Sequence, residues 1–395
     1  MATAEAAQPP SINLGPIAWL RKNLFSTWYN ALLTIIALAL TYAIVRPTLE
    51  WAFTEAKWGV ISANATLFMI GQYPRDQLWR IWLTIYALAA LVGWSWGVWK
   101  AAVRGFAVIA LGAAIAFAVT AITSEVWPNW IGAAVTLIVV YWIAQRVPHA
   151  TRLAVISWVC YFPIVILLIS GTPLIAALPP VELSLWGGLL LTLMLTVVGN
   201  LGSLPLGILL ALGRRSKLPI VRYSCIGYIE LIRGVPLVTI LYMADIMLPL
   251  FLPGGARVDR VIRAMVGFIM FEAAYQAENV RGGLQAIPRG QYEAAHALGL
   301  NTTLTTVLII LPQALRLVIP ALIGSFISLF KDTTLIAIIG LFDILRIGRS
   351  VLGQSEWLGT HREVFLFAFM IYWSFNLAFS YGSRRLEQAS GVGRR

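Results

Sequence analysis

The chain has 395 residues, of which 59% are hydrophobic and 12% are charged. Soluble domains draw roughly a quarter of their residues from the charged types, so the composition excludes a soluble protein and indicates one that lies in a lipid membrane. The formal net charge of +12 does not indicate a nucleic-acid partner, because the basic residues stand in short clusters between apolar runs. Cys160, Cys225 and the three histidines are widely scattered, so we expect no disulfide framework, metal site or cofactor in this chain.

The N-terminal residues, 1–26, are polar or interrupted by proline, which predicts a retained cytoplasmic tail rather than a signal peptide. Beyond them, apolar runs alternate with charged breaks. From Leu185 to Leu212 no charged residue occurs, and a helix of that length exceeds the roughly 30 Å hydrocarbon core of a bilayer. The pattern predicts an all-α polytopic membrane protein with about ten transmembrane helices. These are expected near 27–45, 81–99, 105–122, 130–145, 153–170, 185–212, 222–250, 263–280, 313–330 and 363–381.

Orientation follows from the excess of Lys and Arg on cytoplasmic loops. With both termini inside, including the tail 386–395, the loops 123–129 and 171–184, which lack Lys and Arg, fall on the periplasmic side. The loops 46–80 and 251–262 carry basic residues that this orientation does not explain. The clusters placed inside are Arg21-Lys22, Lys100 with Arg104, Arg146 with Arg152, Arg214-Arg215 with Lys217, and Arg384-Arg385.

A domain boundary is expected after the first half of the spans. The stretch from Gly171 to Pro180 contains three prolines and cannot continue a helix. We therefore expect extra transmembrane helices over 27–172, a periplasmic linker over 173–184 and a second helical domain over 185–385. We find no internal repeat between the two halves.

A long loop, 281–303, separates two of the later spans and is expected to be cytoplasmic. Pro288 and Gly290 would begin a short helix in it, and Gly299 would end that helix as a left-handed cap. Glu293 would complement the helix dipole. Ala294, Ala295 and Leu298 would form a narrow apolar stripe. Two interpretations stay open on these residues: an amphipathic connector on the membrane surface, and a helix that docks in the groove of another protein.

The spacing of this loop resembles a known motif. Glu293-Ala294-Ala295 is followed after three residues by Gly299, and after nine more by Ile309 to Pro312. This resembles the EAA loop of ATP-binding-cassette (ABC) importer permeases at every spaced position. Other segments resemble the polar amino-acid branch of that family: Tyr228 to Glu230 with Arg233 to Leu237, Ala274 to Glu278, Arg281 to Gly283, Gly290-Gln291, Leu311 to Arg316, and Lys331 to Thr333.

The resemblance covers about 185–385 and implies a C-terminal five-helix core of the type I ABC importer kind. The upstream helices resemble the long subunit of general L-amino acid permeases. The family implies a location in the bacterial inner membrane and three kinds of partner besides lipid. These are a second, homologous permease chain forming a heterodimer, two ATP-binding subunits and a periplasmic amino-acid-binding protein.

By the same resemblance, the loop helix would sit in a cleft of the ATPase subunit. The sequence has no G-x-x-x-x-G-K-[ST] phosphate-binding motif, so this chain is expected not to be an enzyme, and ATP and Mg are expected in the partner ATPase. The residues expected to couple ATP hydrolysis to transport are Glu293, Ala294, Ala295, Leu298, Gly299, Leu311 and Pro312.

Ionisable residues inside a membrane are costly and are usually paired or functional. Glu230 and Arg233 lie three apart on one helical face, and Gly234 with Pro236 breaks the helix after them. The start of the next half-helix, together with Arg233, could receive a substrate carboxylate. The alternative, which we favour, is an ion pair between Glu230 and Arg233 that locks helix packing or the interface with a partner.

A second polar set lies on the following helix. Glu272, Tyr275, Gln276 and Asn279 fall on one stripe, and Glu272 could receive the α-ammonium group of an amino acid. With Glu230 and Arg233, these residues form the candidate substrate path.

The sequence therefore favours a permease subunit that moves L-amino acids from periplasm to cytoplasm by alternating access, driven by ATP hydrolysis in a partner. The alternative is a stand-alone secondary transporter or channel, which would have no need of an EAA-type loop and would be expected to show a repeat. A membrane enzyme receives little support, because no nucleophile motif or metal-ligand constellation occurs on the predicted loops.

Overall fold

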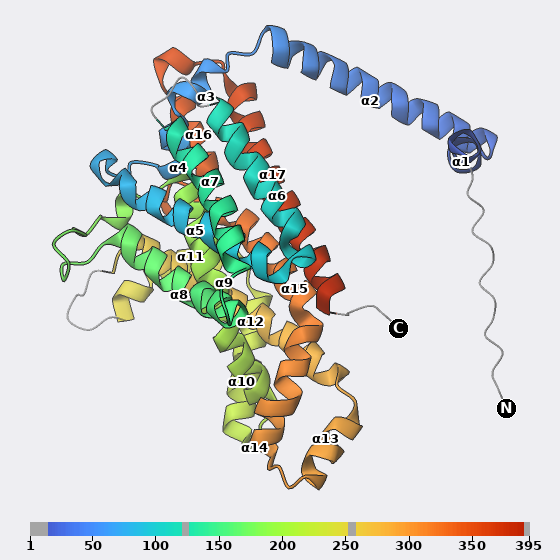
Figure 1. Ribbon diagram of the computed structural model, residues 1–395, viewed down its shortest axis with the longest axis vertical. Coiled ribbons are helices and arrows are strands. Elements are labelled where there is room, and N and C mark those ends of the chain that lie inside the picture. The colour runs from blue at the N-terminus through green and yellow to red at the C-terminus, as the bar shows by residue number, and fades with distance from the viewer. Residues whose placement is uncertain (1–14, 121–125, 252–257, 391–395) are drawn as a thin grey trace. The chain divides into compact units, whose positions relative to one another are not determined.

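The computed structural model describes residues 15–120, 126–251 and 258–390 (Figure 1). Across these ranges the ordered elements are helices, and one isolated bridge joins Gly71 to Trp186. The expected all-α class is confirmed. Parts of the predicted tails and loops, namely 1–14, 121–125, 252–257 and 391–395, lie outside the described residues.

The chain divides into two compact units, 1–59 and 60–395. In the smaller unit, α1 (Pro16–Asn23) precedes α2 (Trp28–Thr54). Thr27 caps α2 by accepting a hydrogen bond from the Asn30 amide at 3.4 Å. With 27 residues, α2 is longer than the expected span and exposes its side chains along its whole length. Such a helix has the length and composition to face lipid on all sides.

The larger unit begins with helices that the sequence places upstream of the permease-like half. Two short helices, α3 and α4, and the turn η1 lead into four long helices, α5 to α8. Among these, α5 and α7 pack closely on each other, and α6 and α8 pack against them. A Cβ at Gly93 of α5 would lie 2.2 Å from the Leu137 carbonyl oxygen of α7, so these two helices need small residues to approach so closely. The elements are α3 (Gly59–Ala63), α4 (Ala65–Ile70), η1 (Arg75–Gln77), α5 (Leu78–Trp99), α6 (Ala101–Thr120), α7 (Trp127–Ala144) and α8 (Ala150–Ser170).

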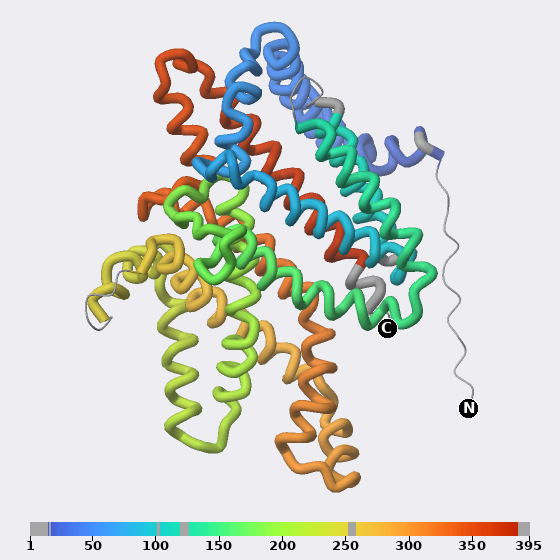
Figure 2. Tube along the Cα trace, turned by 60° about the vertical axis from the view of Figure 1, so that its left-hand side comes forward, coloured from blue at the N-terminus to red at the C-terminus, as the bar shows by residue number. Residues whose placement is uncertain are grey.

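The second half of this unit is built around α12, which packs against α9, α10, α11 and α15. Figure 2 shows α9, α10 and α13 extending toward one end of the unit. The elements are η2 (Leu183–Leu185), α9 (Gly188–Arg214), α10 (Pro219–Gly234), α11 (Leu237–Ile246), η3 (Leu248–Phe251), α12 (Arg260–Ala286), α13 (Arg289–Ala297), α14 (Thr302–Leu304), the π-helical turn η5 (Thr305–Ile310), α15 (Leu311–Asp332), η6 (Thr333–Ile339), α16 (Ile344–Leu352), η7 (Ser355–Trp357) and α17 (His361–Ser390).

Each of the ten expected spans corresponds to helix, but fewer qualify as spans by length and composition. Among the described residues seven helices are long and apolar enough, or eight if one bent pair counts as a span. That pair is α10 and α11, which bend by 107° where a single helix was expected over 222–250. The bend follows from Gly234 and Pro236. The apolar part of α6 is short, and α12 carries five charged residues along its length.

The predicted linker 173–184 lies inside the larger unit, whereas the two units separate at 59/60. The segment before α5 is built into the permease-like half: Phe68 is fully buried in one cluster with Ile344 and Ile347 of α16. Gly71 has φ +67°, and a Cβ there would lie 2.6 Å from the Cα of Gly187. Glycine is therefore required at this crossing.

The structure accounts for Arg80, one of the basic residues in the loop 46–80 that the predicted orientation leaves unexplained. It is fully buried, and its Nη2 donates a hydrogen bond to the Pro179 carbonyl at 2.9 Å. Tyr73 adds a hydrogen bond from its hydroxyl to the Ile169 carbonyl at 2.8 Å. These contacts satisfy carbonyl groups at the end of α8 and in the following loop, so Arg80 is a structural residue rather than a topology signal.

Candidate functional site

The predicted loop helix exists as α13, at one end of the larger unit (Figure 1). Pro288 is its N-cap residue, and Gly299 has φ +79°, the left-handed conformation expected of it. The amides of Gly299 and Leu300 donate to the carbonyls of His296 and Ala295 at 2.9 and 3.1 Å. This pair of hydrogen bonds is the Schellman arrangement, which satisfies the last carbonyls of a helix. Both predicted ends of the helix are confirmed.

The apolar stripe predicted on α13 is wrong in one respect. Ala295 is 3% exposed and faces its own chain, whereas Leu298 is 81% exposed. Glu293 and Ala294 are exposed as well. Positions 294 and 298 are four apart and share a face, while position 295 is turned by about 100° from 294. The face open to a partner therefore carries Ala294 and Leu298, and Ala295 instead holds the helix in place.

Several contacts hold α13 against Arg215, which follows α9, and against the first turn of α15. The Tyr292 ring lies 6.0 Å from the Arg215 guanidinium, and both terminal nitrogens of Arg215 are 3.4 Å from the Tyr292 hydroxyl. Gln313 of α15 donates to the Gln291 side chain at 3.2 Å. Leu311 packs on the hydrophobic cluster beside the helix, and Pro312 is exposed in the first turn of α15. Leu311 of α15 and Tyr292 of α13 thus pack on the same cluster, whereas no contact joins Pro312 to α13 among the described residues.

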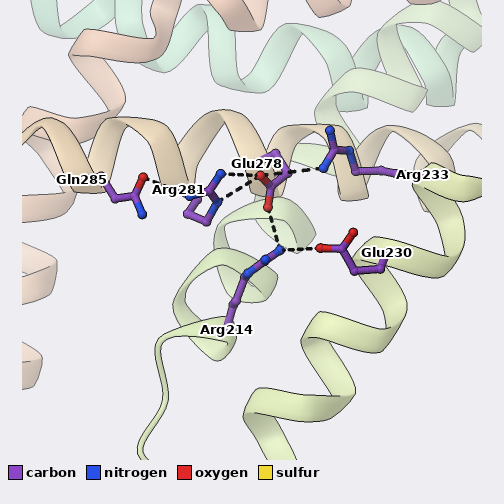
Figure 3. Close-up of polar contacts among 6 residues, drawn as sticks. All are labelled: Arg214, Glu230, Arg233, Glu278, Arg281 and Gln285. Atoms are coloured by element: carbon purple, nitrogen blue, oxygen red, sulfur yellow. Dashed lines mark hydrogen bonds and ion pairs between the residues drawn. The ribbon is translucent and has the colours of Figure 1, made fainter.

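The expected ion pair between Glu230 and Arg233 is replaced by a larger network (Figure 3). Glu230 pairs with Arg214 at 3.1 Å, and Arg233 pairs with Glu278 at 3.7 Å. Arg214 also contacts Glu278 at 2.8 Å, and Arg281 contacts it at 2.7 Å. The direct pair was wrong because each side chain finds a partner on another helix instead. We name Arg214, Glu230, Arg233, Glu278 and Arg281 the ion-pair cluster.

Three members of this cluster were absent from the predicted site. Arg214 reads as a topology signal in the sequence, and Glu278 and Arg281 appear only within the family motif. The spacing of Glu278 and Arg281 could have indicated their ion pair, since residues three apart are neighbours on a helix. In the structure they form a salt bridge on α12, and Arg281 also donates to Gln285 at 2.9 Å.

The polar stripe predicted on α12 divides into two environments. Glu272 and Gln276 are 5% and 2% exposed, and the Gln276 amide donates to the Glu272 carboxylate at 3.1 Å. Asn279 donates to the Ser325 hydroxyl of α15 at 3.2 Å. Tyr275 instead lies beside Arg233, whose guanidinium is 5.4 Å from the ring centre. Glu272 and Gln276 therefore form a buried polar row, the half-buried Asn279 extends it, and Tyr275 belongs with the ion-pair cluster.

The buried polar row has unused hydrogen-bonding capacity. The Gln276 side-chain oxygen is buried and has no hydrogen-bond partner in the part of the chain that the structure describes. Buried polar atoms are normally satisfied, so an unsatisfied one calls for an explanation. No three His, Cys, Asp or Glu side chains come together as a metal site in the described ranges.

Comparisons with known proteins agree with this geometry. A family model described as a binding-protein-dependent transport system inner membrane component matches residues 203–390. The chain is 41% identical to the inner membrane amino-acid ABC transporter permease protein YhdY of Escherichia coli (strain K12), over 96% of this chain and 94% of that protein. The chain belongs to the family of inner-membrane permease components of binding-protein-dependent transport systems.

A second relative is the glutamate/glutamine/aspartate/asparagine transport system permease protein BztC of Rhodobacter capsulatus. It is 36% identical over 96% of this chain and 94% of its own length. A solved structure, described as an amino acid ABC transporter with histidines, covers 50% of this chain and 90% of its own at 28% identity and a TM-score of 0.45. Both long relatives match nearly the whole chain, so the upstream helices are part of the shared architecture.

Membership of this family confirms the predicted membrane location, the predicted ATP-binding and substrate-binding partners and the predicted role as a transport subunit. The permease is an integral inner-membrane subunit of an ABC transporter and works with ATP-binding and substrate-binding partners. It is a transport subunit, and ATP hydrolysis belongs to the partner. The alternative of a stand-alone secondary carrier or channel is excluded by the same finding.

Proposed function

We propose that this permease moves polar L-amino acids from periplasm to cytoplasm as one half of a heterodimer with a second, homologous permease. Two ATP-binding subunits and a periplasmic amino-acid-binding protein would complete the complex. The printed names of both long relatives concern amino-acid transport and support this substrate class. The observation that carries the proposal is α13, a capped helix too short to be stable alone, which offers Ala294 and Leu298 outward.

Coupling to ATP hydrolysis would occur at the exposed face of α13. Ala294 leaves room for a close approach of two backbones, and Leu298, 81% exposed, offers an apolar side chain to a groove. Glu293, near the helix start, would favour a cationic or hydrogen-bonding edge of the cleft. ATP and Mg would bind in the partner, and this chain would carry neither.

The orientation proposed here puts α13 and both chain termini in the cytoplasm. The turn beside α13 carries Arg214, Arg215 and Lys217, and α13 itself begins with Arg289. Such an excess of basic residues favours the cytoplasmic side. The same orientation makes 173–184 a periplasmic linker between the extra helices over 27–172 and a permease core over 185–385, which contains the coupling loop 281–303.

The substrate path would follow the buried polar row. Glu272, at 5% exposure, would receive the α-ammonium group, and the unpartnered oxygen of Gln276 would accept a further hydrogen bond from it. Asn279 would extend the row toward the cytoplasmic side. Because Arg233 and Glu230 are engaged in the ion-pair cluster, a carboxylate contact at Arg233 would require its long contact with Glu278 to open.

A charge reversal on α13 tests the coupling role. The complex carrying Glu293→Lys, reconstituted in liposomes with loaded binding protein, is expected to assemble but to lose ATP-driven amino-acid uptake. Glu55→Lys, the same reversal at the exposed C-cap of α2, is the matched control and should keep uptake. Normal uptake by a fully assembled Glu293→Lys complex would overturn the assignment.

The heterodimer is tested separately by isolating the tagged chain from its native membrane. Recovery of an ATP-binding subunit together with a second permease chain is the expected result. Recovery of the ATP-binding subunit with copies of this chain alone would replace the heterodimer by a homodimer.

A further inference from the structure

The ion-pair cluster joins three helices at the end of the bundle next to α13. Glu278 of α12 is 16% exposed and contacts Arg214, the last residue of α9, Arg233 near the end of α10, and Arg281 on its own helix (Figure 3). Arg214 bridges two carboxylates, because it also contacts Glu230 of α10. A shift of any one of these helices must therefore rearrange contacts of the other two.

The neighbouring residue connects the same turn to the coupling helix. Arg215 directly follows α9, and its guanidinium contacts both the ring and the hydroxyl of Tyr292 on α13. Two adjacent arginines thus face in two directions. Arg214 holds the α9–α10 turn to α12, and Arg215 holds the same turn to α13.

The contacts of Glu278 differ in length. Arg281 and Arg214 lie at 2.7 and 2.8 Å, whereas Arg233 lies at 3.7 Å and is partly engaged by the Tyr275 ring. Three arginines share two carboxylates in this cluster, so one cation is always less fully paired. Arg233 is that residue, and it stands directly before the break at Gly234 where α10 and α11 bend by 107°. The weakest contact lies where a hinge would need to open.

We propose that Glu278 is a positioning residue that couples movement of α13 to the bend between α10 and α11, through Arg214 and Arg215. This proposal rests on the proposed function, since it assigns the path by which docking at α13 reaches the membrane helices. Movement of α13 shifts the α9–α10 turn through Tyr292, displaces Arg214 from Glu278, and alters the hold of Glu278 on Arg233. Elements with two alternative sets of contacts are the physical basis of such coupling.

The test is amino-acid uptake per ATP hydrolysed, measured on the complete complex in liposomes with loaded binding protein outside. Glu278→Gln keeps the shape but removes the charge, and Arg215→Ala cuts the link to α13. Each is expected to lower the uptake-to-hydrolysis ratio by at least about five-fold, the lower end of usual allosteric couplings. The double variant should be no worse than the poorer single variant, because both cut one path. Glu278→Asp, which keeps the charge, should restore part of the ratio.

A control variant and a second test variant distinguish a loss of coupling from a failure of the complex to fold or assemble. Glu50→Gln neutralises an ion-paired carboxylate that is 60% exposed on α2 and should leave the ratio unchanged. If Glu278→Gln fails to assemble, Arg214→Lys keeps a charge but loses the fork that bridges two carboxylates, and the same loss is expected from it.

The outcomes are distinct. A normal ratio in an assembled Glu278→Gln complex, with only its melting temperature lowered, would reduce the cluster to a packing contact and overturn the inference. A double variant whose loss is the product of the two single losses would show two independent paths and would also overturn it. If the unmodified complex fails to take up amino acids at all, the proposed function fails instead.

Discussion

Helices α2 and α12 each have 27 residues, yet they meet opposite surroundings. In α2 every side chain is at least partly exposed, and Arg46 and Glu50 stand near its end. In α12, buried glycine and alanine alternate with the buried Glu272 and Gln276. The first is long and apolar enough to span a membrane, whereas the second carries charged residues along its length. Hydropathy therefore identifies helices that face lipid, whereas a helix surrounded by protein can carry the polar groups needed for transport.

Small residues make the central position of α12 possible. A Cβ at Gly207 of α9 would lie 2.6 Å from the Gln276 Cβ and 3.0 Å from the Ala277 amide nitrogen. On the other side, a Cβ at Gly283 would lie 2.7 Å from the Ala314 carbonyl oxygen of α15. The hydrophobic effect gives little drive for helix association in lipid, so close packing of this kind supplies much of the stability. In α2, by contrast, no side chain is buried within the described residues.

The largest difference between the two helices should appear on truncation of a phenylalanine. Phe268 of α12 is fully buried, whereas Phe53 of α2 is 85% exposed. Phe268→Ala is expected to cost about 3–5 kcal/mol through lost contacts and a cavity. Phe53→Ala should change stability by less than about 0.5 kcal/mol. Melting temperatures of the purified complexes would measure both, and equal losses would contradict the contrast drawn here.

How far the sequence predicts this molecule differs between local and distant features. The ends of α13 could be predicted because Pro288 and Gly299 act through their own backbone preferences. The break after Arg233 follows from Gly234 and Pro236 in the same way. These features need no knowledge of which helices are neighbours.

Other features depend on packing and could not be predicted. The partners of Arg214, Glu230 and Glu278, lie 16 and 64 residues further along the chain, and no local sequence pattern predicts these pairs. The inward turn of Ala295 is decided by where the cluster beside α13 lies, which periodicity alone does not give. Arg80 was likewise hidden, because its burial requires the loop around Pro179 to fold over it.

A smaller effect is expected on substrate uptake, where a charged residue of α12 should matter and the exposed carboxylates of the chain should not. Glu272→Gln keeps the size of the side chain in the buried row of α12 but removes its charge. If Glu272 receives the α-ammonium group, the substrate concentration for half-maximal uptake should rise at least about ten-fold, since a hydrogen bond to a charged group contributes about 1.5–3 kcal/mol. Uptake measured against substrate concentration would show it.

The control for that experiment is an exposed carboxylate. Glu182→Gln, in the loop before η2, should leave the half-maximal concentration unchanged. If Glu272→Gln behaves like Glu182→Gln, the buried row serves packing alone, and the substrate path lies elsewhere in the complex.

The smallest effect is expected on α2 itself. Arg46 and Glu50 are four residues apart and pair at 2.7 Å, but their side chains are 59% and 60% exposed. An exposed pair of this kind contributes little, because solvent screens the charges and two long side chains must be ordered. Glu50→Gln should therefore leave the melting temperature and the recovered amount of every subunit unchanged. A loss of one subunit from the Glu50→Gln complex would show that α2 contacts a partner chain, and the contrast between a lipid-facing and a protein-facing helix would then fail at α2.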